Sequence, residues 1–139
     1  MTLGVGVDII AISRMKDILE QSGKSFINKV FTTWEKQRLE LHPDKVAYAA
    51  MLFAGKEAIF KTFGIGWGHG IQLNEIEIHD GRYGEPIPIL SGRFAEIATE
   101  KGVSRVHVSL SYDGDYAIAM AALAGKGEDN PLKIHGSSL

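Results

Sequence analysis

The sequence predicts an α+β fold in a single domain, in which a partly antiparallel sheet packs against a long buried helix. Strand-like and helix-like segments are mixed without the regular strand–helix–strand repeat of a parallel sheet. Two strand-like runs flank Asp113-Gly114, which is a strong signal for a hairpin. Residues 45–63 carry apolar and small side chains around most of a helix circumference, so that helix must be largely buried. The 139 residues suit one domain, placed at 1–124, with a polar tail at 125–139.

The first 31 residues predict one strand and two helical pieces. Residues 3–12 are rich in β-branched side chains, which favour a strand. Ser13 is a suitable N-cap for a helix that runs to about Ser22, and Gly23 is a typical helix end. The apolar side chains in residues 26–31 then predict a short amphipathic piece.

Caps predict the next two helices. Thr32 and Glu35 have the spacing of a capping box, in which the hydroxyl and the carboxylate each accept a hydrogen bond from a backbone N–H. That helix should end before Pro43, because proline disfavours helical geometry in the residue before it. Asp44 then caps the long buried helix, which is expected to run to about Phe63.

The second half of the chain predicts strands around one more helix. Two prolines in the run 86–90 make it an edge strand, since proline has no N–H to donate to a neighbouring strand. The expected segments are a glycine-rich loop at 64–70, a strand at 71–79, a turn at 80–84, a strand at 86–90, a helix at 91–101, and hairpin strands at 103–112 and 116–123.

Composition argues against several classes of protein. The chain has 15 Lys and Arg against 17 Asp and Glu, which is not the excess positive charge of a nonspecific nucleic-acid binder. It has no cysteine, so disulfides, thiolate zinc sites and a cysteine nucleophile are excluded. The longest uncharged apolar run, at 116–125, has about half of the roughly 20 residues that a membrane helix needs. Asp8 interrupts the apolar N-terminus before a signal-peptide core forms, and we therefore expect a cytoplasmic protein without a membrane or nucleic-acid partner.

The N-terminal part of the chain is basic. Residues 1–38 hold six Lys or Arg and four Asp or Glu, whereas acidic residues are in excess in the remainder. Such a segment can face an acidic protein, but a solvated helical surface would have the same composition.

Charged side chains interrupt two otherwise apolar segments. Asp8 lies within the first predicted strand, where a buried carboxylate needs a cation or several hydrogen-bond donors; capping of backbone amides at a strand end is the structural alternative. Lys56 and Glu57 interrupt the long buried helix, and Lys61 lies on the same face as Glu57, four residues later. The alternative there is a simple surface ion pair, but the apolar surroundings favour a functional role.

A hard divalent cation would account for both features. Mg²⁺ takes oxygen ligands and typically uses one or two carboxylates together with phosphate oxygens of a substrate. Asp8 and Glu57 would supply the carboxylates, and Lys61 would hold a phosphate oxygen. The pattern indicates transfer or hydrolysis at a phosphate ester or anhydride.

These residues belong to a set of motifs that resembles the phosphopantetheinyl transferases, in particular their short, single-domain holo-acyl-carrier-protein synthase type. The resemblance spans about Leu3 to Leu123, in the family's order. The matching motifs are Gly4-x-Gly6-x-Asp8-Ile9-x-x-Ile12-x-Arg14, Phe31-Thr32-x-x-Glu35, Phe53-x-x-Lys56-Glu57-Ala58-x-x-Lys61, Gly84-x-Pro86, and Ser109-Leu110-Ser111 followed by Tyr116-Ala117. The resemblance therefore implies the single-domain α+β fold of the phosphopantetheinyl transferases.

The resemblance also implies a reaction and a set of roles. Coenzyme A would donate its 4′-phosphopantetheine arm to a serine of an apo acyl carrier protein and release adenosine 3′,5′-bisphosphate. Asp8 and Glu57 would bind Mg²⁺ as the cofactor, and Glu57 and Lys61 would be catalytic; the acceptor of the serine proton stays open between Glu57, Lys61 and a water on the metal. The residues implied to contact coenzyme A are Lys61, Gly64, Ser109, Ser111 and Tyr112, and those implied to contact the carrier protein are Arg14 and Phe26. Proteins of this type form trimers with active sites between subunits, so a homotrimer is implied.

Two residues depart from the family pattern. Leu52 stands where an arginine is usual, and Tyr112 stands where a histidine is usual, both at positions that the family associates with the nucleotide end of coenzyme A. Loss of these charge-assisted contacts predicts weaker or rearranged coenzyme A binding. The departures also allow a second interpretation, a noncatalytic paralogue that binds the carrier protein. A third interpretation is a different metal-dependent enzyme that acts on nucleotide pyrophosphates.

Overall fold

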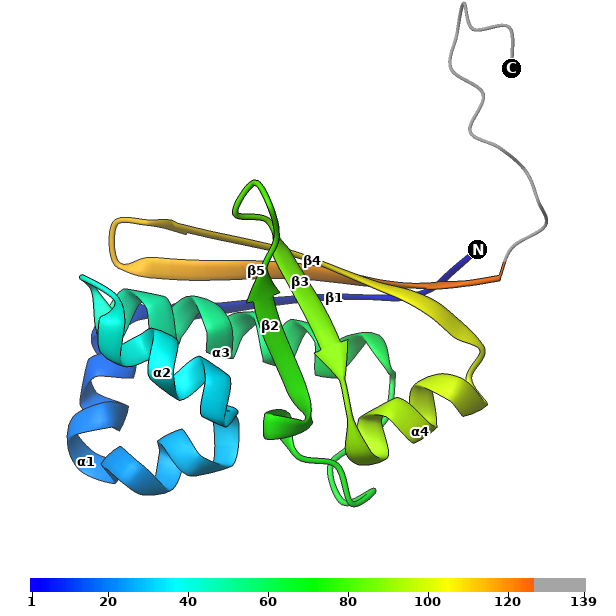
Figure 1. Ribbon diagram of the computed structural model, residues 1–139, viewed down its shortest axis with the longest axis horizontal. Coiled ribbons are helices and arrows are strands. Elements are labelled where there is room, and N and C mark those ends of the chain that lie inside the picture. The colour runs from blue at the N-terminus through cyan, green and yellow to red at the C-terminus, as the bar shows by residue number, and fades with distance from the viewer. Residues whose placement is uncertain (127–139) are drawn as a thin grey trace, which may run out of the picture.

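A computed structural model describes residues 1–126 of the chain (Figure 1). Its elements, in chain order, are β1 (Thr2–Ala11), α1 (Ile12–Val30), α2 (Thr33–Leu41), α3 (Lys45–Thr62), a 3₁₀ helix (Leu73–Glu75), β2 (Ile76–Asp80), β3 (Pro86–Leu90), α4 (Gly92–Glu100), β4 (Val103–Asp113) and β5 (Tyr116–Gly125). Of the tail predicted at 125–139, Gly125 ends β5 and Lys126 follows it, while 127–139 lie outside the described residues.

The strands of this described part form two antiparallel sheets. The larger sheet has the order β1-β5-β4, and the smaller one pairs β2 with β3. Helix α3 lies along one face of the larger sheet, and α1, α2 and the smaller sheet lie on the other side of α3 (Figure 1). The predicted α+β class is therefore confirmed, with the long helix as its central element. No helix in residues 1–126 is both long enough and apolar enough to cross a membrane.

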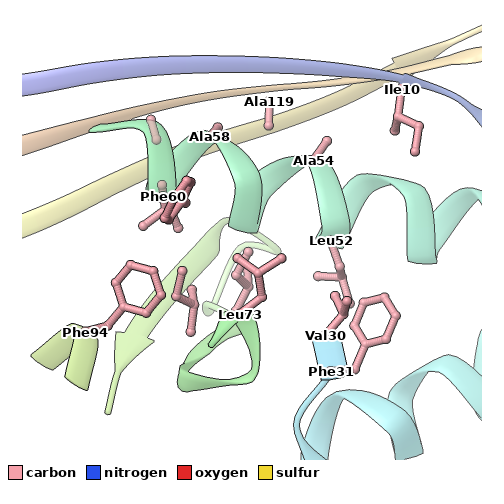
Figure 2. Close-up of a cluster of buried hydrophobic side chains, with 14 of the residues drawn as sticks. Ile10, Val30, Phe31, Leu52, Ala54, Ala58, Phe60, Leu73, Phe94 and Ala119 are labelled. Carbon is pink, nitrogen blue, oxygen red and sulfur yellow. The ribbon is translucent and has the colours of Figure 1, made fainter. Parts of the chain in front are cut away.

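Small and apolar side chains explain why α3 is buried. Ala54 and Ala58 face the larger sheet, while Leu52 and Phe60 face the elements below the helix (Figure 2). Asp44 caps the helix as predicted, because its carboxylate accepts a hydrogen bond from the backbone N–H of Ala47 at 3.1 Å. The capping box of Thr32 and Glu35 at the start of α2 is likewise confirmed.

The strand predicted at 71–79 is partly wrong. The extended segment begins only at Ile76, and Leu73–Glu75 form a 3₁₀ turn before it. The turn is closed locally, since the carboxylate of Glu75 accepts a hydrogen bond from the backbone N–H of Gln72 at 2.8 Å. Strand β3 follows with its two prolines, in a two-stranded sheet in which it is an edge strand as predicted.

The start of α1 also differs from the prediction. The helix begins at Ile12, and Ser13 is not its N-cap. Instead Asp115, in the tight turn between β4 and β5, accepts hydrogen bonds from the backbone N–H of Ser13 (3.0 Å) and from its hydroxyl (2.8 Å). The predicted break at Gly23 is present as a kink with a φ of 38°, beyond which the helix continues to Val30.

Replacing Asp115 by Ala is expected to lower the free energy of unfolding by about 1 kcal/mol, because the first turn of α1 loses its cap. Urea denaturation measures the change. The matched control is Asp113→Ala in the same hairpin, which should change the stability much less. Equal losses in both variants would show that the carboxylate of Asp115 does not act as the cap.

Candidate active site

Two glycines of β1 allow the strand to lie directly on α3. A Cβ on Gly4 would stand 2.1 Å from the carbonyl oxygen of Thr62, and one on Gly6 would stand 2.2 Å from that of Ala58. Side chains alternate along a strand, so Asp8 has the same orientation as Gly4 and Gly6 and faces α3. The close approach thereby brings the carboxylate of Asp8 to the C-terminal half of the helix.

Asp8 forms an ion pair with Lys61. The Nζ atom of Lys61 lies 3.0 Å from Oδ1 of Asp8 and also donates a hydrogen bond to the carbonyl oxygen of Val7 at 3.0 Å. The side chain of Asp8 is 18% exposed and that of Lys61 is 49% exposed. Part of the ammonium group therefore faces solvent and is accessible to a substrate anion.

Glu57 completes this group of charges. It lies on α3 one turn before Lys61 and is half-buried. Burial raises the pKa of the Glu57 carboxyl above its usual value, the negative charge of Asp8 raises it further, and the ammonium of Lys61 lowers it in part. The structure thus brings together the three residues that the sequence singled out, with two carboxylates close enough to repel each other.

The donor set fits a hard divalent cation that is shared with a substrate. Two mutually repelling carboxylates are what a cation would stabilise, and Mg²⁺ commonly uses one or two carboxylates beside phosphate oxygens. Among residues 1–126, no cluster of three or more His, Cys, Asp or Glu side chains is present that could hold a metal alone. Asp8 and Glu57 would therefore form an incomplete shell, which substrate oxygens or water would complete.

The raised pKa of Glu57 gives a direct test of this geometry. Carboxyl ¹³C NMR is expected to show Glu57 titrating above the usual range for glutamate. In Asp8→Asn the pKa of Glu57 should fall, because one negative charge is gone, but remain raised because burial is the larger cause. Protons then compete with a cation for Glu57 as the pH falls through this raised pKa, so metal affinity should fall with it. An ordinary glutamate titration in the wild-type protein would contradict the arrangement.

The serines predicted to contact coenzyme A lie on a different surface. Leu110, between Ser109 and Ser111 on β4, faces α3, where a Cβ on Gly55 would meet it at 2.8 Å. Ser109 and Ser111 therefore point to the opposite, outer face of the larger sheet, away from the site at Asp8. Tyr112 is 58% exposed near the end of β4, on the edge of the sheet opposite β1. One copy of the chain does not bring these side chains to the carboxylates.

The other predicted contacts lie on or just after elements that adjoin the site, namely α1, which follows β1, and α3. Gly64 comes after the C-cap residue of α3, Phe63, and three residues after Lys61, with a left-handed φ of 65°. Arg14 is exposed in the first turn of α1. Phe26 is half-buried, and its ring packs edge-on against Phe53 with centroids 5.3 Å apart. Phe26 thus has a structural contact as well as the predicted role toward a carrier protein.

Two other side chains of α3 point into the core. Lys56, which interrupts the apolar pattern just as Glu57 does, is fully buried on another side of the helix and does not join Asp8. Leu52 is 1% exposed and packs in the core beside Val30 and Phe31 (Figure 2). The prediction of weaker coenzyme A binding concerns the arginine that is absent from this position, and it stays a prediction, together with that for Tyr112.

Comparisons with known proteins agree over nearly the whole described chain. The family model of the 4′-phosphopantetheinyl transferase superfamily matches residues 4–121. The holo-[acyl-carrier-protein] synthase of Serratia proteamaculans is 36% identical over 123 residues, which are 88% of this chain and 98% of the relative. The crystal structure of the holo-ACP synthase of Plasmodium yoelii is 31% identical, with a TM-score of 0.81 over 91% of this chain and 98% of that one.

A third relative was solved with a ligand. The holo-(acyl-carrier-protein) synthase of Bacillus anthracis, in complex with CoA (3′,5′-ADP), is 27% identical with a TM-score of 0.75, over 91% of this chain and 99% of that chain. Both the sequence match and the fold extend across the elements that hold Asp8, Glu57 and Lys61. The chain therefore belongs to the 4′-phosphopantetheinyl transferase superfamily, as an enzyme of the holo-[acyl-carrier-protein] synthase type.

Proposed function

We propose that this enzyme transfers the 4′-phosphopantetheine arm of coenzyme A to a serine of an apo acyl carrier protein in the cytoplasm, with Mg²⁺ as cofactor. Adenosine 3′,5′-bisphosphate is the second product. The observation that carries the proposal is the meeting of Asp8, Glu57 and Lys61 between β1 and α3. The names of the relatives and the CoA complex of one of them support the choice of substrates.

The reaction exchanges one phosphorus–oxygen bond for another. The serine oxygen bonds to the β-phosphorus of coenzyme A, the bond from that phosphorus to the bridging oxygen breaks, and the adenosine bisphosphate leaves with the α-phosphate. Mg²⁺ held by Asp8 and Glu57 would polarise the attacked phosphoryl group and offset the charge of the leaving phosphate. Lys61 is held at Asp8 with its ammonium partly exposed, where it donates a charge-assisted hydrogen bond to a phosphate oxygen. The acceptor of the serine proton would be Glu57, a water on the metal, or Lys61 in its neutral form, since the ammonium form that binds a phosphate has no lone pair to accept it.

The carrier protein would dock along α1. Acyl carrier proteins are acidic, and Arg14 presents an exposed cation at the start of this helix. At its other end Phe26 contacts Phe53, which lies one turn before Glu57 on α3. A carrier bound to Arg14 and Phe26 would therefore present its serine near the carboxylates.

Mass spectrometry of the carrier protein tests the proposal. Apo carrier incubated with the enzyme, coenzyme A and Mg²⁺ is expected to gain the mass of one phosphopantetheine. A carrier that binds but stays unmodified would instead support a noncatalytic paralogue, and hydrolysis of nucleotide without any carrier would support a pyrophosphate-cleaving enzyme. Either of these results would overturn the proposed transfer.

We also propose that the active enzyme is a homotrimer whose sites lie between subunits. Ser109 and Ser111 lie on the outer face of the larger sheet, opposite the face that holds Asp8, so a site that uses both needs a second copy. The same outer face exposes a row of apolar side chains, and such a patch favours association. Its exposed members are Val5 (66%), Val7 (53%), Ile9 (59%), Ile118 (42%) and Met120 (60%).

A charge placed on this outer face is expected to dissociate the trimer. Met120→Glu should lower the mass measured by sedimentation velocity to that of a 15.2 kDa chain and reduce kcat by at least about tenfold, since each site would lose its second copy. The control Ile89→Glu places the same charge at an exposed apolar position of the smaller sheet. It should change neither the mass measured by sedimentation velocity nor kcat. Full activity of a monomeric Met120→Glu protein would contradict shared sites.

A further inference from the structure

The interior of the molecule contains an ion pair that the proposed chemistry does not use. Lys56 and Glu35 are both fully buried, and the Nζ atom of Lys56 donates a hydrogen bond to Oε1 of Glu35. The same ammonium also lies within hydrogen-bond distance of three backbone carbonyl oxygens, those of Val30 (2.7 Å), Leu73 (3.3 Å) and Ile76, so its three N–H groups serve four acceptors. One side chain of α3 is thus bound to the end of α1, to α2, to the 3₁₀ turn and to β2.

Glu35 has equally complete contacts. Its Oε1 atom accepts the backbone N–H of Thr32 at 2.9 Å, which closes the capping box of α2, and its Oε2 atom accepts the backbone N–H of Ile78 at 2.9 Å. Within residues 1–126 no buried side-chain nitrogen or oxygen lacks a hydrogen-bond partner. Both side chains of the pair are therefore fully hydrogen-bonded inside the core.

Stability alone is a poor explanation for this pair. Burial lowers the pKa of the Lys56 ammonium below its usual value, and the charge of Glu35 offsets only part of that effect. Well-packed apolar residues commonly replace a buried ion pair without loss of stability. What an apolar side chain cannot reproduce is a set of directed bonds that fixes the rotation of α3 about its axis.

Because Lys56 is next to Glu57 in the sequence, the rotation of α3 about its axis also determines where Glu57 points. Adjacent side chains on a helix point about 100° apart, so the direction of Lys56 determines the direction of Glu57. Lys56 is held in the interior by its contacts, while Glu57 faces Asp8 on β1. A small rotation of α3 would move the carboxylate of Glu57 away from that of Asp8.

We propose that the buried Lys56–Glu35 pair is a positioning device that orients α3 so that Glu57 meets Asp8 in the geometry needed for the cation. The inference rests on the proposed role of Asp8 and Glu57 as Mg²⁺ ligands. Lys56 and Glu35 act through Glu57 and touch neither substrate nor metal.

The test measures Mn²⁺ binding by electron paramagnetic resonance, with saturating coenzyme A and no carrier protein, so that no turnover is involved. The double variant Glu35→Gln/Lys56→Met removes both charges together and avoids an unpaired buried ion. Its Mn²⁺ dissociation constant is expected to rise about tenfold, a size typical of residues that orient metal ligands. Its kcat should fall while the KM for coenzyme A changes less than twofold.

Two further variants separate positioning from stability. Glu35→Asp keeps the charges but shortens the carboxylate, and should give an intermediate loss of Mn²⁺ affinity in a folded protein. Ile97→Ala opens a cavity in the core under α4, far along the chain from the pair, and should lower Tm without changing Mn²⁺ binding. Wild-type Mn²⁺ affinity in both Glu35→Asp and the double variant would overturn the inference, as would a matching loss in Ile97→Ala. Absence of Mn²⁺ binding in the wild-type protein would instead overturn the proposed metal site itself.

Discussion

Asp8→Asn and Glu57→Gln are each expected to reduce the kcat for phosphopantetheine transfer by roughly 100- to 1,000-fold, because each removes one of the two carboxylates that would hold the cation against the diphosphate. The fold should survive both changes. Asp8 loses an ion pair to a lysine that is 49% exposed, which contributes little to stability. A steady-state assay of carrier modification at saturating coenzyme A measures the loss.

Glu57→Gln is also expected to leave the free energy of unfolding at neutral pH unchanged or to raise it. The pKa of the Glu57 carboxyl is higher in the folded protein than in the unfolded chain. Such a group stabilises the fold at pH values below its pKa in the unfolded chain, and this stabilisation is lost as the pH rises through its pKa in the folded protein. At neutral pH an ionised Glu57 therefore opposes folding, and the amide should be at least as stable. Glu40→Gln, a carboxylate-to-amide change at an exposed ion pair of α2, is the matched control and should keep full activity. A near-normal rate of Asp8→Asn at limiting Mg²⁺ would remove the basis for the metal site.

Local signals in the sequence predicted the elements that close within a few residues. The capping box of Thr32 and Glu35, the cap at Asp44 and the hairpin at Asp113-Gly114 are all present. Each involves groups three residues apart or strands joined by a tight turn, so the chain needs no distant partner to form it. The meeting of Asp8 with Glu57 and Lys61 was predicted as well, since charges in apolar segments need partners.

Contacts between distant segments could not be predicted in the same way. Asp115 caps α1 at Ser13, 102 residues earlier in the chain, and no pattern around Ser13 reveals that partner. The sequence also presents Lys56 and Glu57 as equivalent interruptions of one apolar helix. Only the surrounding elements decide that Lys56 enters the core while Glu57 faces β1.

Gly6→Ala is expected to have the second large effect, through the contact between β1 and α3. The added Cβ would stand 2.2 Å from the carbonyl oxygen of Ala58, which is backbone and cannot rotate away, and 3.1 Å from Cβ of Lys61. Strand and helix must separate, at a cost of about 1–3 kcal/mol in the free energy of unfolding. Because Asp8 and Lys61 lie on the two separated elements, a shift of about 1 Å should lower kcat roughly 100-fold.

The same substitution at Gly66 is the matched control for Gly6→Ala. Gly66 has ordinary backbone angles and no atom within 4 Å of an added Cβ, so Gly66→Ala should leave stability and kcat unchanged. Thermal denaturation and the carrier-modification assay, run on both variants, separate the steric effect from the loss of a glycine as such. If Gly6→Ala keeps wild-type kcat and Tm, then β1 does not lie against α3 closely enough to bring Asp8 to Lys61, and the geometry on which the metal site depends is wrong. If Tm falls but kcat does not, the contact stabilises the fold without positioning the carboxylates.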